Sequence, residues 1–98
     1  GNIEIPWNCT INSATLLADQ TGSIVVDVWR DNYANYPPSG EDSICAAAKP
    51  TISASNKAQD TTLTGWSTSL LKGQILGFNV DSVATITRVS VNLGVTKT

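Results

Sequence analysis

Hydrophobic and polar residues alternate along the first part of the chain, which is the pattern of a β-strand with one buried face. From Ile3 to Ile11 every second residue is apolar, and the residues between them are mostly polar. Pro6 has no backbone N–H to donate, so it marks an edge or a break in this strand. The alternation weakens after Asn12, which indicates a β-bulge before the strand continues.

A second strand pattern, "SIVVDVW" (residues 23–29), is largely apolar on both faces, with Asp27 as its acidic residue. Strands that are covered on both sides have this pattern, so we expect a central position in a sheet. The preceding residues 19–22 have the composition of a turn, in which Gly22 can adopt a positive φ angle.

The segment between residues 30 and 50 interrupts the strand patterns. Pro37 and Pro38 fix their own φ angles and favour an extended backbone at Tyr36, which excludes a regular strand or helix over residues 30–39. The sequence "SGEDSICAAA" (39–48) predicts a helix of about two turns, with Ser39 and Asp42 as a capping box. A helix this short needs tertiary packing. The side chains that can supply it are Ile44, Cys45 and Ala48.

Further strands are expected at residues 51–55, around 63–66, at 74–80 and at 84–98, with turns at 72–73 and 81–82. The residues predicted to form the core are Val26, Val28, Leu76, Phe78, Val89, Val91 and Leu93. Short strands separated by short turns predict one all-β domain over residues 1–98. We expect an antiparallel β-sandwich of jelly-roll type with one short helix in a crossing loop.

Composition and charge narrow the function classes. The 98 residues carry eight acidic and six basic side chains, and the six cations are scattered along the sequence. Nucleic-acid binding needs clustered Lys and Arg, so we expect no nucleic-acid partner. No stretch approaches the roughly 18 apolar residues of a membrane span, so we also expect no membrane partner. No signal peptide is recognisable at the N-terminus.

The chain lacks the residues on which most catalytic and metal sites depend. It contains no His, which excludes a Ser–His–Asp triad, a Cys–His pair and a His-based zinc site. No glycine-rich phosphate loop is present, and nothing singles out a pair of carboxylates for glycoside hydrolysis. We therefore expect a protein that is not an enzyme and has no cofactor or metal. Cys9 and Cys45 form either two small buried hydrophobes or one disulfide bridge.

Aromatic residues are the remaining candidates for a binding site, because their faces stack on sugar rings while polar neighbours orient the hydroxyls. Trp7 and Trp29 lie at alternating strand positions and are expected to be buried, whereas Tyr33 and Tyr36 lie in the proline-bounded loop and are expected to be exposed. The candidate ligand-binding residues are Asp31, Asn32, Tyr33, Asn35, Tyr36 and Trp66. Two alternatives stay open: the tyrosines cover the open end of the sandwich, or they form a subunit interface.

Several stretches resemble a domain of tailed-bacteriophage structural proteins. They are "LLADQTGSIVVDVW", the "NYPPS…DSI…KPTIS" crossing, "LTGW" and "GQILGFNVDS", and the resemblance extends from Ile3 to Lys97. Such C-terminal β-sandwich domains occur in tail fibres, spikes and similar virion proteins, and these motifs mark the family rather than a catalytic site. Cys45 departs from the family pattern, in which a small polar residue is expected, and this argues against a bridge to Cys9.

The resemblance implies a virion component that is assembled in the cytoplasm of the host bacterium, where its cysteines stay reduced. It implies a non-catalytic appendage domain, a fragment of a longer protein, that binds a receptor or glycan on the host cell surface. It also implies a homotrimer and contacts with other virion proteins. The alternative is a purely structural virion domain that serves in trimerisation, capping or capsid decoration.

Overall fold

The computed structural model describes residues 2–98, which form an all-β fold as the sequence predicts. The strands are β1 (Asn2–Glu4), β2 (Cys9–Asp31), β3 (Thr51–Asp60), β4 (Ser69–Leu70), β5 (Ile75–Ala84) and β6 (Val89–Lys97). They form one six-stranded sheet in which all pairs are antiparallel. Two 3-10 helices, η1 (Tyr33–Asn35) and η2 (Gly40–Asp42), lie between β2 and β3.

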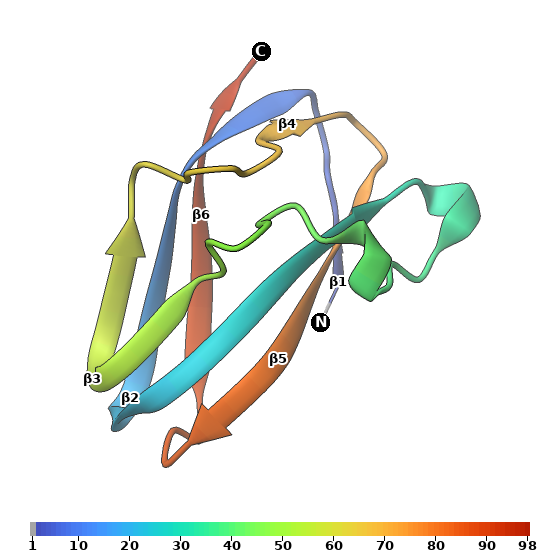
Figure 1. The fold of residues 1–98 in the computed structure, drawn as a ribbon. Helices are drawn as coiled ribbons and strands as arrows, with labels where there is room; N and C mark the ends of the chain where they lie inside the picture. Colours follow the sequence, from blue (N-terminus) through green and yellow to red (C-terminus); the bar gives the residue numbers. More distant parts are fainter. Residues whose placement is uncertain (1) are drawn as a thin grey trace.

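The long strand β2 organises this sheet. Its first half pairs with β6, from Cys9 opposite Lys97 to Ala18 opposite Val89, and its second half pairs with β5. Between the two halves the strand bends sharply, so that its blue part descends and its cyan part rises again in Figure 1. Strand β3 bends with it, because residues 51–55 pair with the second half of β2 and residues 57–60 with the first.

The core lies between the two halves of the folded sheet. The larger cluster joins Cys9 and Ile11 from the first half of β2 with Val28 from the second half and Leu76 from β5. The smaller cluster lies toward the bend and contains Leu16, Ile24, Val26, Ile52 and Ile86. Because these clusters combine residues from distant parts of the chain, burial of the core holds the sheet in its folded shape.

The predicted core is confirmed for Val26, Val28 and Leu76, and only partly for Phe78 of β5 and for the residues of β6. Val26, Val28 and Leu76 are at most 1% exposed. The remaining predicted residues are half-buried against the two clusters, namely Phe78, Val89, Val91 and Leu93. Within residues 2–98, β6 pairs only with β2, so its other edge is open and its inward side chains are less covered.

The predicted bulge is confirmed, because the register between β2 and β6 shifts between Ile11 and Ser13. The predicted turn at residues 19–22 is wrong, since these residues continue β2 through its bend. Gly22 is needed there because its Cα packs against the backbone of Ala84. The predicted turn at 81–82 is also wrong: β5 continues to Ala84, and the chain turns after it at Thr85, which has a φ of 74°.

The predicted helix over residues 39–48 is wrong beyond its first turn, which is the three-residue η2. After η2, Ser43 forms an isolated bridge with Trp29, and the amide of Ile44 donates to the carbonyl of Val28 at 2.9 Å. This extended pairing beside β2 satisfies the backbone polar groups that a helix would have paired internally. It also places Ile44 and Cys45 in the core, as expected.

The segment after Pro50 forms one strand, β3, that is longer than the predicted residues 51–55. The strand predicted around residues 63–66 is instead a turn, in which Leu63 has a φ of 53°. Asp60 explains this turn, because its Oδ1 accepts hydrogen bonds from the amides of Thr62 at 2.9 Å and Leu63 at 3.0 Å. The turn at residues 72–73 is confirmed by a φ of 90° at Gly73.

Trp7 is 44% exposed, so the prediction that it is buried is wrong. The break at Pro6 separates β1 from β2 and takes Trp7 out of the strand ladder. The Lys97 ammonium lies 5.3 Å from the centroid of the Trp7 ring, within the range of a cation–π contact. Trp29 is half-buried in the second half of β2.

Candidate binding surface around Tyr33 and Tyr36

The loop that follows β2 carries the aromatic candidates. It begins at Asp31, whose Oδ1 accepts hydrogen bonds from the Asn32 amide at 2.7 Å and from Asn35 Nδ2 at 3.3 Å. The amide of Tyr36 donates to the carbonyl of Tyr33 at 3.2 Å, which closes the turn of η1. These short-range polar contacts hold the loop without burying either aromatic ring.

The base of the loop is anchored on β5 and β2. Tyr36 has the extended conformation that the prolines predict, with φ of −56° and ψ of 139°. Pro38 is buried beside Gly77, where a β-carbon would lie 3.5 Å from Pro38 Cγ. Gly40 faces the Trp29 ring, since its β-carbon would lie 3.9 Å from Cζ2. Pro38 and η2 therefore fasten the loop to the sheet.

The predicted capping box of Ser39 and Asp42 is confirmed at the start of η2. The amide of Ser39 donates to Asp42 Oδ2 at 2.8 Å, and the amide of Asp42 donates to the carbonyl of Ser39 at 2.9 Å. The first bond belongs to the capping box and the second is a backbone turn bond. Together they fix the end of the loop that carries Tyr33 and Tyr36 (the tyrosine loop), even though the helix that the capping box was expected to start is absent.

A shallow groove of about 230 Å³ lies between the loop and the N-terminal strand. Tyr33 and Tyr36 border it and are 76% and 50% exposed. Its other lining residues are Asn2, Ile3 and Glu4 of β1 and Ile75 of β5. Asn2 Nδ2 donates to the Tyr36 hydroxyl at 3.1 Å, which joins the loop wall to the β1 wall.

The register of the sheet explains why these distant residues meet. Glu4 lies opposite Ile75, and Ile75 lies opposite Asp31 on its other side. Residues that face each other on adjacent strands share one face of the sheet, so Glu4 and Ile75 lie beside the point where the tyrosine loop leaves β2. The residues of β1 and β5 were not predicted as part of the site, because no motif in the sequence indicates that β1 pairs with β5.

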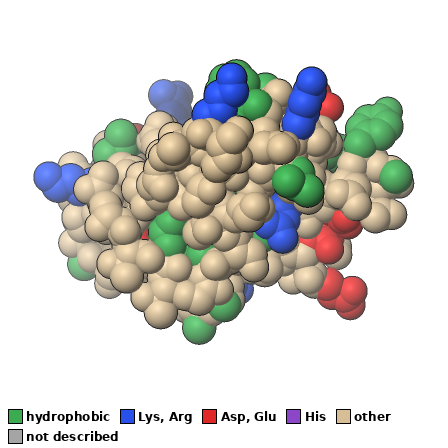
Figure 2. All heavy atoms as spheres, turned by 90° about the horizontal axis from the view of Figure 1, so that it is seen from above, with side chains coloured by type: hydrophobic (Ala, Val, Ile, Leu, Met, Phe, Trp, Pro, Cys, Tyr) green, Lys and Arg blue, Asp and Glu red, His purple; other side chains and the backbone are tan. Residues whose placement is uncertain are grey.

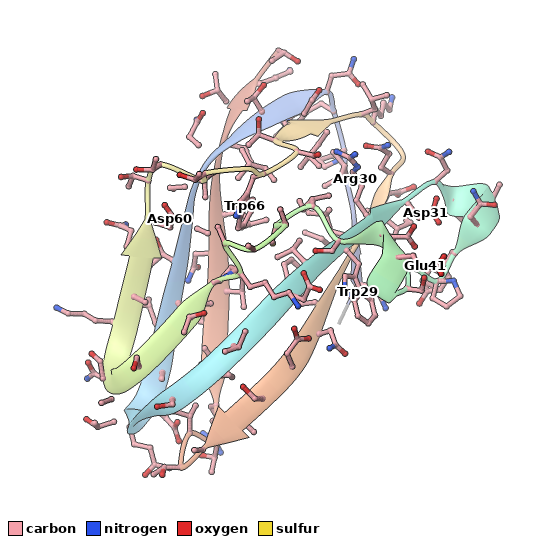
Figure 3. The ribbon with its side chains drawn as sticks, in the orientation of Figure 1. Trp29, Arg30, Asp31, Glu41, Asp60 and Trp66 are labelled. Atoms are coloured by element: carbon pink, nitrogen blue, oxygen red, sulfur yellow. The ribbon has the colours of Figure 1, made fainter. Side chains whose placement is uncertain are left out.

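Trp66 does not belong to this surface. It is buried in the core at 9% exposure, and its indole N–H donates to the carbonyl of Ala48 at 2.9 Å. Figure 3 shows it inside the fold, away from Asp31 at the base of the loop. The candidate residues that the structure does bring together are Asp31, Asn32, Tyr33, Asn35 and Tyr36.

A second polar cluster, on the second half of β2, has a structural role. Asp27 is 4% exposed, and its carboxylate accepts hydrogen bonds from the Trp29 indole at 2.9 Å and the Ser43 hydroxyl at 2.6 Å. Lys49 Nζ lies 3.6 Å from Asp27 Oδ2 and 2.6 Å from Asp81 Oδ2. The hydrogen bond between Lys49 and Asp81 raises the pKa of the amine and lowers the pKa of that carboxyl. All these groups are paired with one another, so the cluster stabilises the sheet.

Within residues 2–98 no group of three or more Cys, Asp or Glu side chains is placed to hold a metal ion. No helix in the same residues is long and apolar enough to cross a membrane. Cys9 and Cys45 are both free thiols in the core, which agrees with the first of the two alternatives. Burial raises the pKa of the Cys45 thiol to about 12.

Comparisons of this chain with protein-family models, with curated proteins and with solved structures give no significant match. The bacteriophage resemblance of the sequence motifs therefore stays a prediction. We infer the function from the candidate surface together with those motifs.

Proposed function

We propose that this chain is a non-catalytic domain of a bacteriophage tail fibre or spike, and that it binds a receptor or glycan on the host surface. In this proposal the folded sheet is a β-sandwich related to the jelly roll, and the domain resides in the virion. One observation carries the binding role: Tyr33 and Tyr36 are exposed on a loop whose base is anchored to the sheet. The virion role is supported by the sequence motifs that resemble bacteriophage structural proteins.

The chemistry of the groove suits a sugar ring. A tyrosine offers an apolar face for the C–H side of a sugar and a hydroxyl for hydrogen bonds. Ile3 and Ile75 add apolar lining, and Asn2 and Glu4 add polar groups at the same wall. Burying a large apolar side chain contributes about 1.5–3 kcal/mol to folding, so two aromatic rings left in water forgo that stabilisation. A role in ligand binding explains why both tyrosine rings are exposed.

The size of the groove limits the ligand. Its volume of about 230 Å³ lies below the roughly 300–1,000 Å³ of ordinary ligand pockets. We therefore expect contact with one sugar unit at a time and weak binding by a single domain. A trimeric appendage would offset this weakness, because linked sites raise the overall avidity by about 10²–10⁴ without any new contact.

The test is a double variant, Tyr33→Ala with Tyr36→Ala, compared with the wild type on a glycan array and on host cells. We expect binding to fall about tenfold or more, since each lost stacking contact is worth about 0.5–1.5 kcal/mol. The melting temperature should change by only a few degrees because both rings are exposed. The matched control, Tyr33→Phe with Tyr36→Phe, keeps the rings and should retain most of the binding.

A different result would favour the alternative in which the tyrosines are structural. The double alanine variant would then lose several kcal/mol of stability, and its binding would fall only in proportion to that loss. In that case the tyrosines pack over the open end of the fold and have no binding role. Unchanged binding by a stable double variant would rule out the groove as the receptor site.

One observation favours the second candidate function, a structural role in virion assembly. Ile3, Trp7 and Val95 are 52%, 44% and 44% exposed, and together with Leu93 they line an apolar groove of about 220 Å³ on the other side of β1. A second copy of the chain can cover such a surface in a closed homotrimer. Sedimentation of the wild type and of Trp7→Ser tests this role: we expect a trimer that the variant weakens, and a wild-type monomer at tens of micromolar would count against it.

A further inference from the structure

Among residues 2–98, the tyrosine groove is lined by one acidic side chain and by no basic one. Glu4 lines it directly, and Asp31 and Glu41 lie at the same end of the molecule, as Figure 3 shows. Figure 2 shows this end from above, with hydrophobic side chains protruding beside acidic ones and no basic ones at its tip. Unlike the carboxylates of the Asp27 cluster, Glu4 has no cationic partner among residues 2–98.

Arg30, the residue before Asp31, does not compensate the negative charge beside the groove. It precedes Asp31 in β2, so its side chain lies on the opposite face of the strand. There its Nη1 donates to the carbonyl of Ser69 at 2.6 Å. Lys49, the only cation in an ion pair within residues 2–98, is held by Asp27 and Asp81 on the sheet. Within residues 2–98 the lining of the groove therefore contains one carboxylate, Glu4, and no basic side chain.

The aromatic rings strengthen this preference. The face of a tyrosine ring is negative, and a cation within about 6 Å of its centroid is attracted by roughly 0.5–1 kcal/mol at an exposed site. Tyr33 and Tyr36 are 76% and 50% exposed and line the same groove as Glu4. Two aromatic rings and one carboxylate around a small groove form a site that is complementary to an alkylammonium group.

We propose that the groove binds a positively charged nitrogen, and that the host ligand is a sugar that carries a protonated amine. This inference rests on the proposed function for the sugar, but the preference for a cation is a property of the groove itself. A neutral sugar of the same shape should bind less tightly, because it lacks the attraction to Glu4 and to the tyrosine faces.

The first experiment uses the smallest probe, tetramethylammonium, and its neutral counterpart of similar size, tert-butanol. Each is titrated into the full chain while the NMR signals of Tyr33, Tyr36 and the β1 amides are followed. We expect tetramethylammonium to shift these signals and to bind at least about fivefold more tightly than tert-butanol. Glu4→Gln should remove most of this difference. Glu41→Gln, which removes a charge at the same end outside the groove, should change it less than about twofold.

The second experiment compares the methyl glycosides of glucosamine, N-acetylglucosamine and glucose at about pH 6, where the free amine is protonated. The glucosamine derivative should bind about fivefold more tightly than the other two, and only in chains that retain Glu4. Equal binding of all three glycosides at the tyrosines would overturn the cation preference and leave the proposed function standing. Failure of tetramethylammonium to shift the groove signals would also overturn the cation preference. The proposed function is tested separately, by the binding of the tyrosine variants to host cells.

Discussion

Gly22 and Ala84 lie closer together than any side chain at position 22 would permit. A β-carbon on Gly22 would lie 2.5 Å from the carbonyl oxygen of Ala84 and 2.9 Å from Ile86 Cγ1. This contact occurs at the bend of β2, where its two halves change partners from β6 to β5. The folded shape of the sheet therefore depends on the absence of one side chain.

Gly22→Ala should destabilise the domain by about 3 kcal/mol or more, because the clash is with backbone atoms that cannot rotate away. Chemical denaturation, followed by tryptophan fluorescence, measures this loss. Gly40→Ala is the matched control: its β-carbon would lie 3.9 Å from the Trp29 ring, an ordinary contact, and should change stability by less than about 1 kcal/mol. Equal stability of the two variants would show that the bend tolerates a side chain.

Asp27→Ala should cost about 3 kcal/mol, because it leaves the Trp29 indole, the Ser43 hydroxyl and Lys49 without their shared acceptor. Asp81→Ala removes the more exposed partner of Lys49 and should cost less than about 1 kcal/mol. Urea denaturation of both variants distinguishes the two positions. A small loss at Asp27 would mean that the buried carboxylate merely fills space.

Acid should destabilise the protein through Asp19 and Asp60. The hydroxyl of Thr87 and the amide of Arg88 donate to the Asp19 carboxylate and lower its pKa, and the amides of Leu63 and Thr62 do the same for the pKa of Asp60. A carboxyl whose pKa is lower in the folded state adds stability above its ordinary pKa of about 3.8, and this contribution is lost as the pH falls through the folded pKa.

Denaturation midpoints between about pH 5 and pH 2 test this prediction on the wild type and on Asp19→Asn with Asp60→Asn. The asparagine side chains keep an acceptor oxygen but cannot titrate, so the variant should lose less stability with falling pH. Parallel curves for the two proteins would contradict the role of these carboxylates in the acid response.

Alkali should destabilise the protein through Cys45. Burial raises its folded pKa from 9.0 to about 12, so only the unfolded chain ionises this thiol between those values. The contribution of this thiol to stability is therefore fully present below pH 9 and falls as the pH rises above it, by up to about 1.4 kcal/mol per pH unit. Cys45→Ala should show a shallower decline between about pH 9 and pH 10.5 than the wild type, since the two proteins differ in this thiol alone. Rapid alkylation of Cys45 in the native protein would contradict its burial.

The pattern of the sequence alone was enough to predict the features that depend on local chemistry. Alternation identified the core-facing side chains Val26, Val28 and Leu76, because a strand exposes every second residue to the same face. The prolines predicted the extended backbone at Tyr36, and the composition of the loop predicted that Tyr33 and Tyr36 are exposed. These properties need no knowledge of which strands are neighbours.

Only the tertiary structure decided the features that depend on contacts between distant segments. The bend of β2 looks like a turn in the sequence, but pairing with β5, β6 and β3 keeps the strand continuous. Residues 43–45 favour a helix locally, yet the bridge between Ser43 and Trp29 and the hydrogen bond from Ile44 to Val28 hold them against β2 instead. The groove itself arises because β1 pairs with β5 and brings Glu4 beside the tyrosine loop, which lies about 30 residues away. Such pairings follow from the free energy of the whole fold, which no local stretch of residues encodes.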